Sequence, residues 1–502
     1  MGKTYIYIYV LLSQAFIIVN LITLSNLTPW VDEVMMLDTS YNAAFHGSWE
    51  TTAWYRMARQ SPFSTYPPLY QMIATVWMWV FGCSLVAVRS MNILFTFVLG
   101  GVSLRFMKHH GLPLTLWTTL LFTVLLWGTS EMAWIYRNGR PDMLCALVFV
   151  FTAQTVDYHL SAKSATSSMA VVAISALLLC SGIQAVVYLS GLWLFYFIVL
   201  KSHRKEIARL LTLLLTGFIL GLLLVSLFML VNGRLVAFVC SIVQYSVTLS
   251  SIALTVLPRV GGLLDIDTAL YTQKLSELTP ASNLCGWLAS ITGYHSYLVL
   301  SVMALVAYAT DFKNNLHKLI GDKGFLLLLC ALYVPFFMNL AGRFTIYYRW
   351  MMFLPLMIAV TSIAARHRLW CALFVLAGMV MSVFGIKSML PNGDFNYGNL
   401  RSFVQRQHFK SSDAVVCPFS VFYEIKPVCD TCYFVGIFPT EFLGHVDYII
   451  ETPDRDTPDQ PITDYVNSLK ADTTVMLTAV DHCEHPSLTL YKVKTRYEHT
   501  SH

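Results

Sequence analysis

The sequence predicts a polytopic α-helical membrane protein with a small α/β domain at its C-terminus. Of its 502 residues, 56% are hydrophobic and only 12% are charged, whereas soluble proteins are roughly one quarter charged. Apolar runs long enough to cross a bilayer recur along most of the chain. Near residue 391 they give way to short alternating segments that are typical of strands. We therefore expect a transmembrane domain over residues 1–390 and an extracytoplasmic α/β domain over residues 391–502.

The apolar runs place the helices of the first domain. Residues 5–24 have the length of one span, and no small-residue cleavage site follows, so we predict a retained helix rather than a signal peptide. Residues 69–81 are too short for a span and are predicted to lie at the outer interface. Residues 235–257 are predicted to be interfacial or re-entrant, because a span there would place the basic cluster 313–323 outside. The other spans are expected at residues 88–107, 112–128, 142–160, 168–184, 186–200, 210–231, 295–310, 324–340, 350–365 and 370–387.

Clusters of basic residues orient these spans. Lys, Arg and His gather at residues 108–110, 201–205, 313–323 and 366–368, and such clusters mark cytoplasmic loops. The pattern predicts about eleven spans, with the N-terminus inside and the C-terminus outside. Because Lys and Arg serve topology here, the net charge of +5 gives no reason to expect nucleic acid. We expect membrane lipids as partners instead.

This topology gathers a specific set of charged residues on the outer face. The adjacent carboxylates Asp32 and Glu33 follow the first span directly, and ionisable residues in such a place are functional candidates. The outer basic residues of the membrane part are nearly all Arg, with Lys274 as the exception. The planar guanidinium suits bidentate binding of an anion, and a membrane-borne anion approached from outside is most simply a lipid phosphate. These arginines are Arg56, Arg59, Arg89, Arg137, Arg140, Arg343 and Arg349.

Carboxylates and arginines together fit group transfer from a lipid phosphate. A carboxylate takes the proton from an acceptor hydroxyl, and Arg side chains stabilise the phosphate as it leaves. A phosphate is already a good leaving group, so no general acid is needed. Glycosidases differ because they need two carboxyl groups in acid and base roles.

Several segments carry a family resemblance, in order and on one predicted face. They are Asp-Glu at 32–33, the segment 66–82 that starts Tyr-Pro-Pro-Leu-Tyr and ends Phe-Gly, and Tyr-Arg-Asn-Gly-Arg-Pro-Asp at 136–142. Together they resemble motifs of the GT-C glycosyltransferases of the protein O-mannosyltransferase and lipid A aminoarabinose-transferase type, which use polyprenyl-phosphate sugars as donors. Arg89 stands where the family's next helix usually begins with Arg, and residues 349–355 match a late element more loosely. The resemblance covers about residues 1–365.

The resemblance implies roles for individual residues and an inverting reaction. Asp32 would be the catalytic base and Glu33 a supporting residue. Tyr66 stands where many relatives have His or an acidic-Lys pair, so the contact to donor phosphate or metal at this point is open. The donor-phosphate ligands would be Arg137 and Arg140, with Arg89 and Arg349 as further candidates, and the substrate contacts would include Tyr66 and Asp142.

Simpler interpretations of the same residues remain. Asp32 and Glu33 precede a helical pattern that Gly47 closes, so they could merely cap that helix. Arg137 and Arg140 could be solvated charges at the level of the lipid headgroups. The remaining outer arginines could be headgroup contacts or helix anchors, namely Arg56, Arg59, Arg343 and Arg349.

Cysteine usage in the C-terminal domain suggests structural disulfides. Cys429 and Cys432 form a C-x-x-C pair, with Cys417 and Cys483 in the same domain. A redox role lacks the usual helix-start context, whereas disulfides suit an oxidising compartment. The run at residues 481–485 is rich in metal-ligand types, but its spacing fits no standard zinc pattern, so we expect a surface loop.

We therefore predict a multipass inverting glycosyltransferase that moves a sugar from a polyprenyl phosphate to a hydroxyl of a lipid, glycan or protein. The expected place is the bacterial inner membrane, with the active site and the C-terminal domain in the periplasm. The chain lacks the large luminal insertion of eukaryotic protein mannosyltransferases, which argues against the endoplasmic reticulum. The alternatives are a transporter or flippase of polar or lipid-linked solutes and a non-catalytic scaffold. The sugar, the acceptor and the involvement of a divalent metal stay open.

Overall fold

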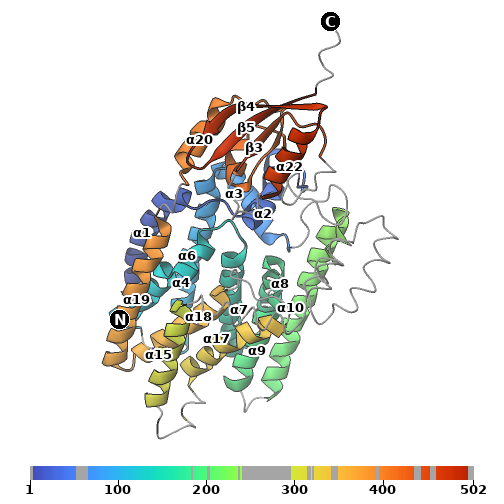
Figure 1. The fold of residues 1–502 in the computed structure, drawn as a ribbon. Helices are drawn as coiled ribbons and strands as arrows, with labels where there is room; N and C mark the ends of the chain where they lie inside the picture. The colour runs from blue at the N-terminus through green and yellow to red at the C-terminus, as the bar shows by residue number, and fades with distance from the viewer. Residues whose placement is uncertain are drawn as a thin grey trace. The chain divides into compact units, whose positions relative to one another are not determined.

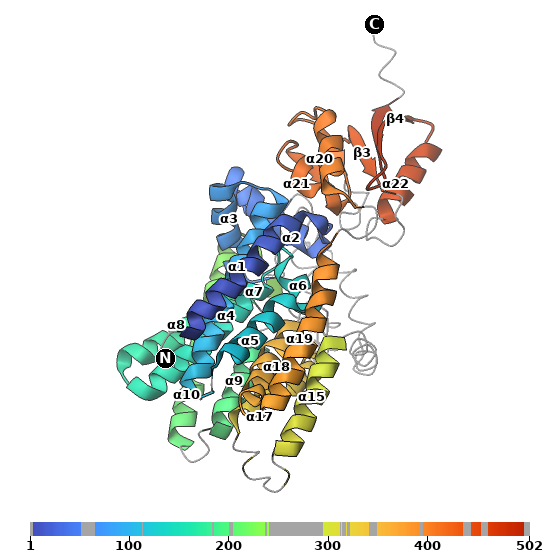
Figure 2. The same ribbon diagram turned by 90° about the vertical axis from the view of Figure 1, so that its left-hand side faces the viewer.

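The computed structural model describes most of the chain as helices and a small C-terminal sheet (Figures 1 and 2). The described residues form two compact units, each discussed by itself. Unit 1 comprises Met1–Asn20, Ser64–Tyr70 and Asn92–Ser388, and unit 2 comprises Leu21–Phe63, Gln71–Met91 and Met389–His502. The description leaves out residues 1–3, 52–65, 113, 183–184, 200–203, 236–237, 240–294, 312, 314–317, 319–321, 341–348, 391–394, 435–442, 453–459 and 496–502.

Every predicted span coincides with an observed helix. Five helices among the described residues are long and apolar enough to cross a membrane, namely α1, α4, α7, α10 and α19. The protein is thus an integral membrane protein, while the number of about eleven spans stays a prediction. The helices are α1 (Thr4–Thr23), α4 (Leu85–His109), α5 (Leu116–Gly128), α7 (Asp142–Ala162), α8 (Ala165–Ser181), α9 (Ala185–Val199), α10 (Arg204–Val231), α15 (His295–Asp311), α17 (Lys323–Leu340), α18 (Arg349–Ala364) and α19 (Arg368–Met389).

Close packing of small residues holds the helices of unit 1 together. Helix α8 packs against α7 and α10, and α18 packs against α5, α15 and α17. The pair α8 and α10 lie side by side in both views (Figures 1 and 2). A Cβ atom added to Gly217 of α10 would lie 2.3 Å from the carbonyl oxygen of Val172 on α8. Glycine at this position is therefore what lets the two backbones touch.

One expectation for the loops needs correction. The predicted outer loop at residues 131–142 begins with a helix, α6 (Ser130–Tyr136). Thr129, which precedes this helix, has an extended backbone. The predicted interfacial segment 235–257 lies largely outside the described residues. The predicted interfacial helix at 69–81 is observed as α3 (Leu69–Phe81).

Unit 2 contains the predicted α/β structure. Its sheet has the order β2-β1-β3-β5-β4, in which β1 is parallel to β2 and β3, and β5 is antiparallel to β3 and β4. Helix α22 packs on β3 and β4 (Figure 2). Its Ile462 and Val466, one turn apart, join Val416 and Ile449 in a buried core. The elements are α20 (Tyr397–Arg406), β1 (Ala414–Val416), η4 (Phe419–Val421), α21 (Phe422–Ile425), β2 (Thr431–Tyr433), β3 (Tyr448–Glu451), α22 (Gln460–Ala471), β4 (Val475–Cys483) and β5 (Leu488–Thr495).

Segments from the first part of the chain also belong to unit 2. They include η1 (Leu24–Asn26) and α2 (Val31–Phe45), together with most of α3 and the first residues of α4. The carboxylates Asp32 and Glu33 therefore lie in the same compact unit as the C-terminal sheet.

Candidate functional site

The two predicted carboxylates occupy the first turn of α2. Trp30 precedes the helix in an extended conformation, and its backbone N–H donates to Glu33 Oε2 at 3.4 Å. Carboxylates in this position satisfy unpaired helical N–H groups and interact favourably with the helix dipole. The simpler interpretation as a helix cap thus holds for Glu33. It does not exclude a chemical role for Asp32, which is half-buried.

A buried ion pair joins Glu33 to Arg89. Both side chains are 0% exposed. Arg89 donates from Nε to Glu33 Oε1 at 2.9 Å and from Nη2 to Glu33 Oε2 at 2.7 Å. It also donates to the carbonyl oxygens of Leu24, Leu27 and Thr28 at 2.8–3.2 Å. These contacts use the five N–H groups that a guanidinium has.

The prediction that Arg89 binds the donor phosphate does not agree with this geometry. A residue that binds phosphate needs N–H groups that point toward the phosphate. The N–H groups of Arg89 donate instead to Glu33 and to the backbone that leads into α2. Arg89 instead connects the start of α4 to the start of α2. Its physical role is to hold the segment that carries the two carboxylates.

Glu33 receives another hydrogen bond from the C-terminal part of the chain. The Tyr423 hydroxyl donates to Glu33 Oε1 at 2.7 Å, and Tyr423 is buried. Burial, and then the Glu33 charge, raises the pKa of Tyr423 well above its usual value, so the hydroxyl keeps its proton. Both carboxylate oxygens of Glu33 accept from protein donors. Asp32 is the more exposed member of the pair.

A second ion pair ties α2 to the same segment. Lys426 Nζ lies 2.9 Å from Asp38 Oδ1, and the two side chains are 1% and 0% exposed. The Thr51 hydroxyl donates to Asp38 Oδ2 at 2.6 Å. Burial would lower the pKa of Lys426, but Asp38 outweighs it and the pKa is raised, so Lys426 keeps its proton near neutral pH. No local pattern predicts this pair, because its members are far apart in the chain.

Unit 1 holds the other predicted charges in the turn between α6 and α7. Arg140 Nε donates to Asp142 Oδ2 at 3.0 Å, and these side chains are 1% and 2% exposed. Arg137 donates from Nη1 to Asn20 Oδ1 at 3.0 Å and is 1% exposed. The simpler interpretation as solvated loop charges is therefore wrong. Burial of arginine beside polar partners is instead what a prepared anion site needs.

Two asparagines that sequence reasoning missed fix this turn. Asn92 on α4 donates to the carbonyl oxygen of Arg140 at 2.8 Å and also to that of Asn138. Asn20 on α1 accepts from Arg137 and donates to Phe16 O at 2.9 Å. Polar amides inside apolar helices need buried partners. Asn20 and Asn92 each stand inside an apolar run, and this placement in the sequence was the available signal.

The remaining predicted residues are placed only in part. Tyr66 lies half-buried just before α3. Arg349 is the first residue of α18, and its side chain is outside the description. The described residues do not include Arg56, Arg59, Lys274 or Arg343.

Cysteines and candidate metal ligands add no second site to the described part of the chain. Cys429, Cys432 and Cys483 form no disulfide, so the prediction of disulfides at the C-x-x-C pair is wrong. Burial raises the pKa of Cys429 and of Cys432 to about 12, and Cys432 lies on β2 rather than at a helix start. Among the described residues, no group of three His, Cys, Asp or Glu could hold a metal ion. The predicted surface loop at residues 481–485 begins as the end of β4.

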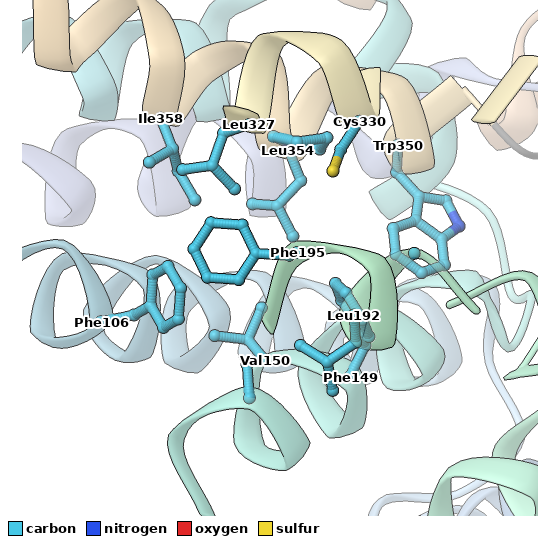
Figure 3. A pocket seen from close by; sticks show the side chains of 13 residues that line it. Phe106, Phe149, Val150, Leu192, Phe195, Leu327, Cys330, Trp350, Leu354 and Ile358 are labelled. Atoms are coloured by element: carbon cyan, nitrogen blue, oxygen red, sulfur yellow. The ribbon is translucent and has the colours of Figure 1, made fainter. Parts of the chain in front are cut away.

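Unit 1 also holds an apolar cavity of about 70 Å³. Figure 3 shows Leu327, Leu354 and Ile358 facing Val150 and Phe195 across it. The lining comes from α4, α7, α9, α17 and α18. Gly191 belongs to the lining, and a Cβ atom added there would meet nothing within 4 Å. Such walls suit a hydrocarbon and no charged group.

Comparisons with known proteins bear on the fold. No family model matches the sequence, and no curated protein matches it. The Archaeoglobus fulgidus oligosaccharyltransferase in its apo form has a TM-score of 0.52 at 10% identity, covering 90% of this chain and 70% of that chain. ArnT from Cupriavidus metallidurans bound to undecaprenyl phosphate has a TM-score of 0.48 at 13% identity, covering 99% of each chain. The Archaeoglobus fulgidus oligosaccharyltransferase AglB in complex with an inhibitory peptide and a dolichol-phosphate has a TM-score of 0.48 at 10% identity.

At such identities the likeness shows the fold alone. The expected resemblance to GT-C glycosyltransferases is confirmed at that level: the chain has the fold of the Archaeoglobus fulgidus oligosaccharyltransferase, a GT-C glycosyltransferase.

Proposed function

We propose that the protein is an inverting glycosyltransferase that moves a sugar from a polyprenyl phosphate to a hydroxyl group of a lipid, glycan or protein on the outer face of the membrane. The observation that carries the proposal is a difference in burial between two adjacent carboxylates. Glu33 is fully buried and accepts from Arg89 and Tyr423, while Asp32 is half-buried in the same helical turn. Glu33 is fixed as a support, and the more exposed Asp32 is the proposed base.

In the proposed reaction Asp32 takes the proton of the acceptor hydroxyl. The acceptor oxygen then attacks the anomeric carbon on the side opposite the phosphate. The bond between that carbon and the phosphate oxygen breaks, and the lipid phosphate leaves with the electron pair. The proton ends on Asp32, and the sugar has inverted its anomeric configuration. A buried Glu33 alongside keeps Asp32 in place without competing for the proton.

Arg137 and Arg140 are the proposed ligands of the donor phosphate. Both are buried in a turn whose backbone Asn92 holds through two hydrogen bonds. A guanidinium held in this way offers charge and direction to an anion with little reorganisation. Asp142 orients Arg140 through its Nε. Arg349 and Tyr66 stay candidates for further contacts to the donor.

The apolar cavity of unit 1 is the proposed place for part of the prenyl chain. Its lining has aliphatic and aromatic side chains and belongs to the unit that holds Arg137 and Arg140. A lipid-linked donor needs both an anion site and a hydrocarbon site. A donor with a soluble nucleotide would use no such cavity.

Donor turnover tests the proposal. The protein is purified in nanodiscs, mixed with a panel of polyprenyl-phosphate sugars and a host lipid and glycan extract, and assayed for released polyprenyl phosphate. We expect release from one donor, transfer of its sugar, and a product of inverted anomeric configuration. Release from no donor by folded protein would contradict the proposal and favour a transporter, a flippase or a scaffold.

A further inference from the structure

We infer that Tyr423 and Lys426 are positioning residues for the reaction, through which the C-terminal α/β segment orients Asp32. The inference rests on the proposed function. It assigns to this segment a part in catalysis that no motif of the chain suggests. Neither residue touches a reacting atom in this account. Both act through α2, the helix that carries Asp32.

Tyr423 and Lys426 come from one short stretch that directs both side chains to the same helix. Tyr423 belongs to α21, and Lys426 follows as its C-terminal cap. Residues three apart in a helical turn lie on one face. The Tyr423 hydroxyl lies 2.7 Å from Glu33 Oε1, and Lys426 Nζ lies 2.9 Å from Asp38 Oδ1.

These contacts hold α2 at two points. Glu33 and Asp38 are five residues apart, which is about 7.5 Å along a helix and more than one turn around it. Arg89 already holds α2 at Glu33. The contacts from Tyr423 and Lys426 add restraints at Glu33 and Asp38, which fix the rotation of the helix as well as its position. Asp32 is the neighbour of Glu33, so the direction of its carboxylate follows from the rotation of α2.

The stretch that provides the contacts is itself anchored. The Tyr397 hydroxyl of α20 donates to Glu424 Oε1 at 2.8 Å. Phe419 stacks on Phe434, which follows β2, with ring centroids 5.1 Å apart. Both contacts connect α21 and η4 to the rest of the α/β segment. A rigid support of this kind is what a positioning residue needs.

The chemistry of the contacts also points beyond packing. A buried ion pair is rarely the most stabilising way to fill a site, because apolar residues of similar volume do as well or better. Lys426 and Asp38 are nevertheless an ion pair at 1% and 0% exposure. Hydrogen bonds have directional requirements that apolar contacts lack, and the Tyr423 hydroxyl donates one to Glu33. A base must point at the proton that it takes, so directional contacts suit the orientation of Asp32.

The test compares Tyr423→Phe with a matched control in the nanodisc assay. Tyr423→Phe removes only the hydroxyl that contacts Glu33. Tyr465→Phe removes a half-buried hydroxyl on α22, which packs against the core of the sheet. We expect Tyr423→Phe to lower kcat roughly tenfold with the KM of the donor unchanged. Tyr465→Phe should change kcat less than about twofold, and both variants should unfold at similar temperatures.

A double-mutant cycle shows whether the effect passes through Asp32. In an Asp32→Asn background the hydroxyl of Tyr423 has no base left to orient, so Tyr423→Phe should cause no further loss. Lys426→Met should lower kcat in the same way, and Lys426→Arg should retain most of the activity because it keeps the cation.

The outcomes separate the inference from the proposed function. If wild type turns over a donor and Tyr423→Phe matches it, the inference is wrong and the proposed function stands. Additive losses in the Asp32→Asn background would equally overturn the inference, since they indicate a role that is independent of Asp32. If wild type turns over no donor, the proposed function fails and the inference fails with it.

Discussion

Two buried arginine–carboxylate pairs occur in the two units, and they differ in what surrounds the arginine. Arg89 donates to both oxygens of Glu33 and to three backbone carbonyl groups. Arg140 donates from Nε to Asp142, and its own carbonyl accepts from Asn92. In the first pair the guanidinium holds the backbone. In the second pair the backbone of the arginine is itself held.

This difference separates a structural arginine from a candidate phosphate ligand. Both arginines occur in segments that resemble family motifs, and both are 0–1% exposed. Neither burial nor motif distinguishes them. The hydrogen bonds of Arg89 do, because all five of its N–H groups donate to Glu33 and to backbone carbonyl groups.

Loss of Arg89 should have the largest effect on stability. Arg89→Met leaves Glu33 buried with its charge uncompensated, which typically costs about 3–5 kcal/mol. The backbone carbonyl groups of Leu24, Leu27 and Thr28 would also lose their donor. Thermal unfolding in detergent should show a much lower midpoint. An unfolding midpoint equal to that of wild type, with weaker donor binding, would reverse the comparison and make Arg89 a ligand.

Arg140→Lys should affect the donor rather than the fold. Lysine keeps the positive charge but cannot make the planar bidentate contact. We expect the KM of the donor to rise roughly tenfold, while the unfolding midpoint stays near that of wild type. The rise of the unfolding midpoint on adding polyprenyl phosphate should also shrink. An unchanged KM would remove Arg140 from the donor site.

Filling the apolar cavity should have a smaller effect that depends on the length of the donor. Gly191→Leu places a side chain into the cavity from α9, where an added Cβ meets no atom within 4 Å. We expect the KM to rise about threefold for long prenyl chains and to stay unchanged for a donor of one or two isoprene units. Gly191→Ala serves as the control of smaller volume. Equal effects on both donors would mean that the cavity holds no donor chain.

A pH effect on the C-terminal sheet should be the smallest. Burial raises the pKa of Asp447, but the hydrogen bonds from the Ala414 N–H and from His445 outweigh it, so the pKa lies below the usual 3.8. The stabilisation is present above the pKa of the unfolded chain and is lost as the pH falls through the lower, folded pKa. The protection factor of the Ala414 amide, whose N–H donates to Asp447 at 2.9 Å, should therefore fall on acidification below pH 3.8. Asp447→Asn should flatten this pH dependence, and an unaltered profile would contradict the assignment.

Local patterns were enough to predict the elements of the fold. Apolar length predicted each span as a helix, and short alternating segments predicted the strands that follow residue 391. Helix α6 was missed because seven residues carry too little periodicity to distinguish a helix from a loop. The disulfides were wrongly expected because a C-x-x-C spacing does not say which way each thiol points.

The candidate site was only partly accessible to the same reasoning. Motifs brought attention to Asp32, Glu33 and Arg140, but not to the partners that decide their roles. Tyr423 lies 390 positions after Glu33 and pairs with it across the fold. No local pattern encodes such a contact. The role of Arg89 changed for a similar reason, since three of its acceptors are backbone carbonyl groups, which every residue has.

Turnover by Asp32→Asn tests most directly whether Asp32 is the base and Glu33 its support. The variant should fold as wild type does, because Asp32 is half-buried rather than part of the buried Glu33–Arg89 pair. We predict that its donor turnover falls at least about a hundredfold. The control Asp464→Asn, which changes an exposed carboxylate on α22, should keep full activity. Turnover by folded Asp32→Asn at the wild-type rate would contradict the account.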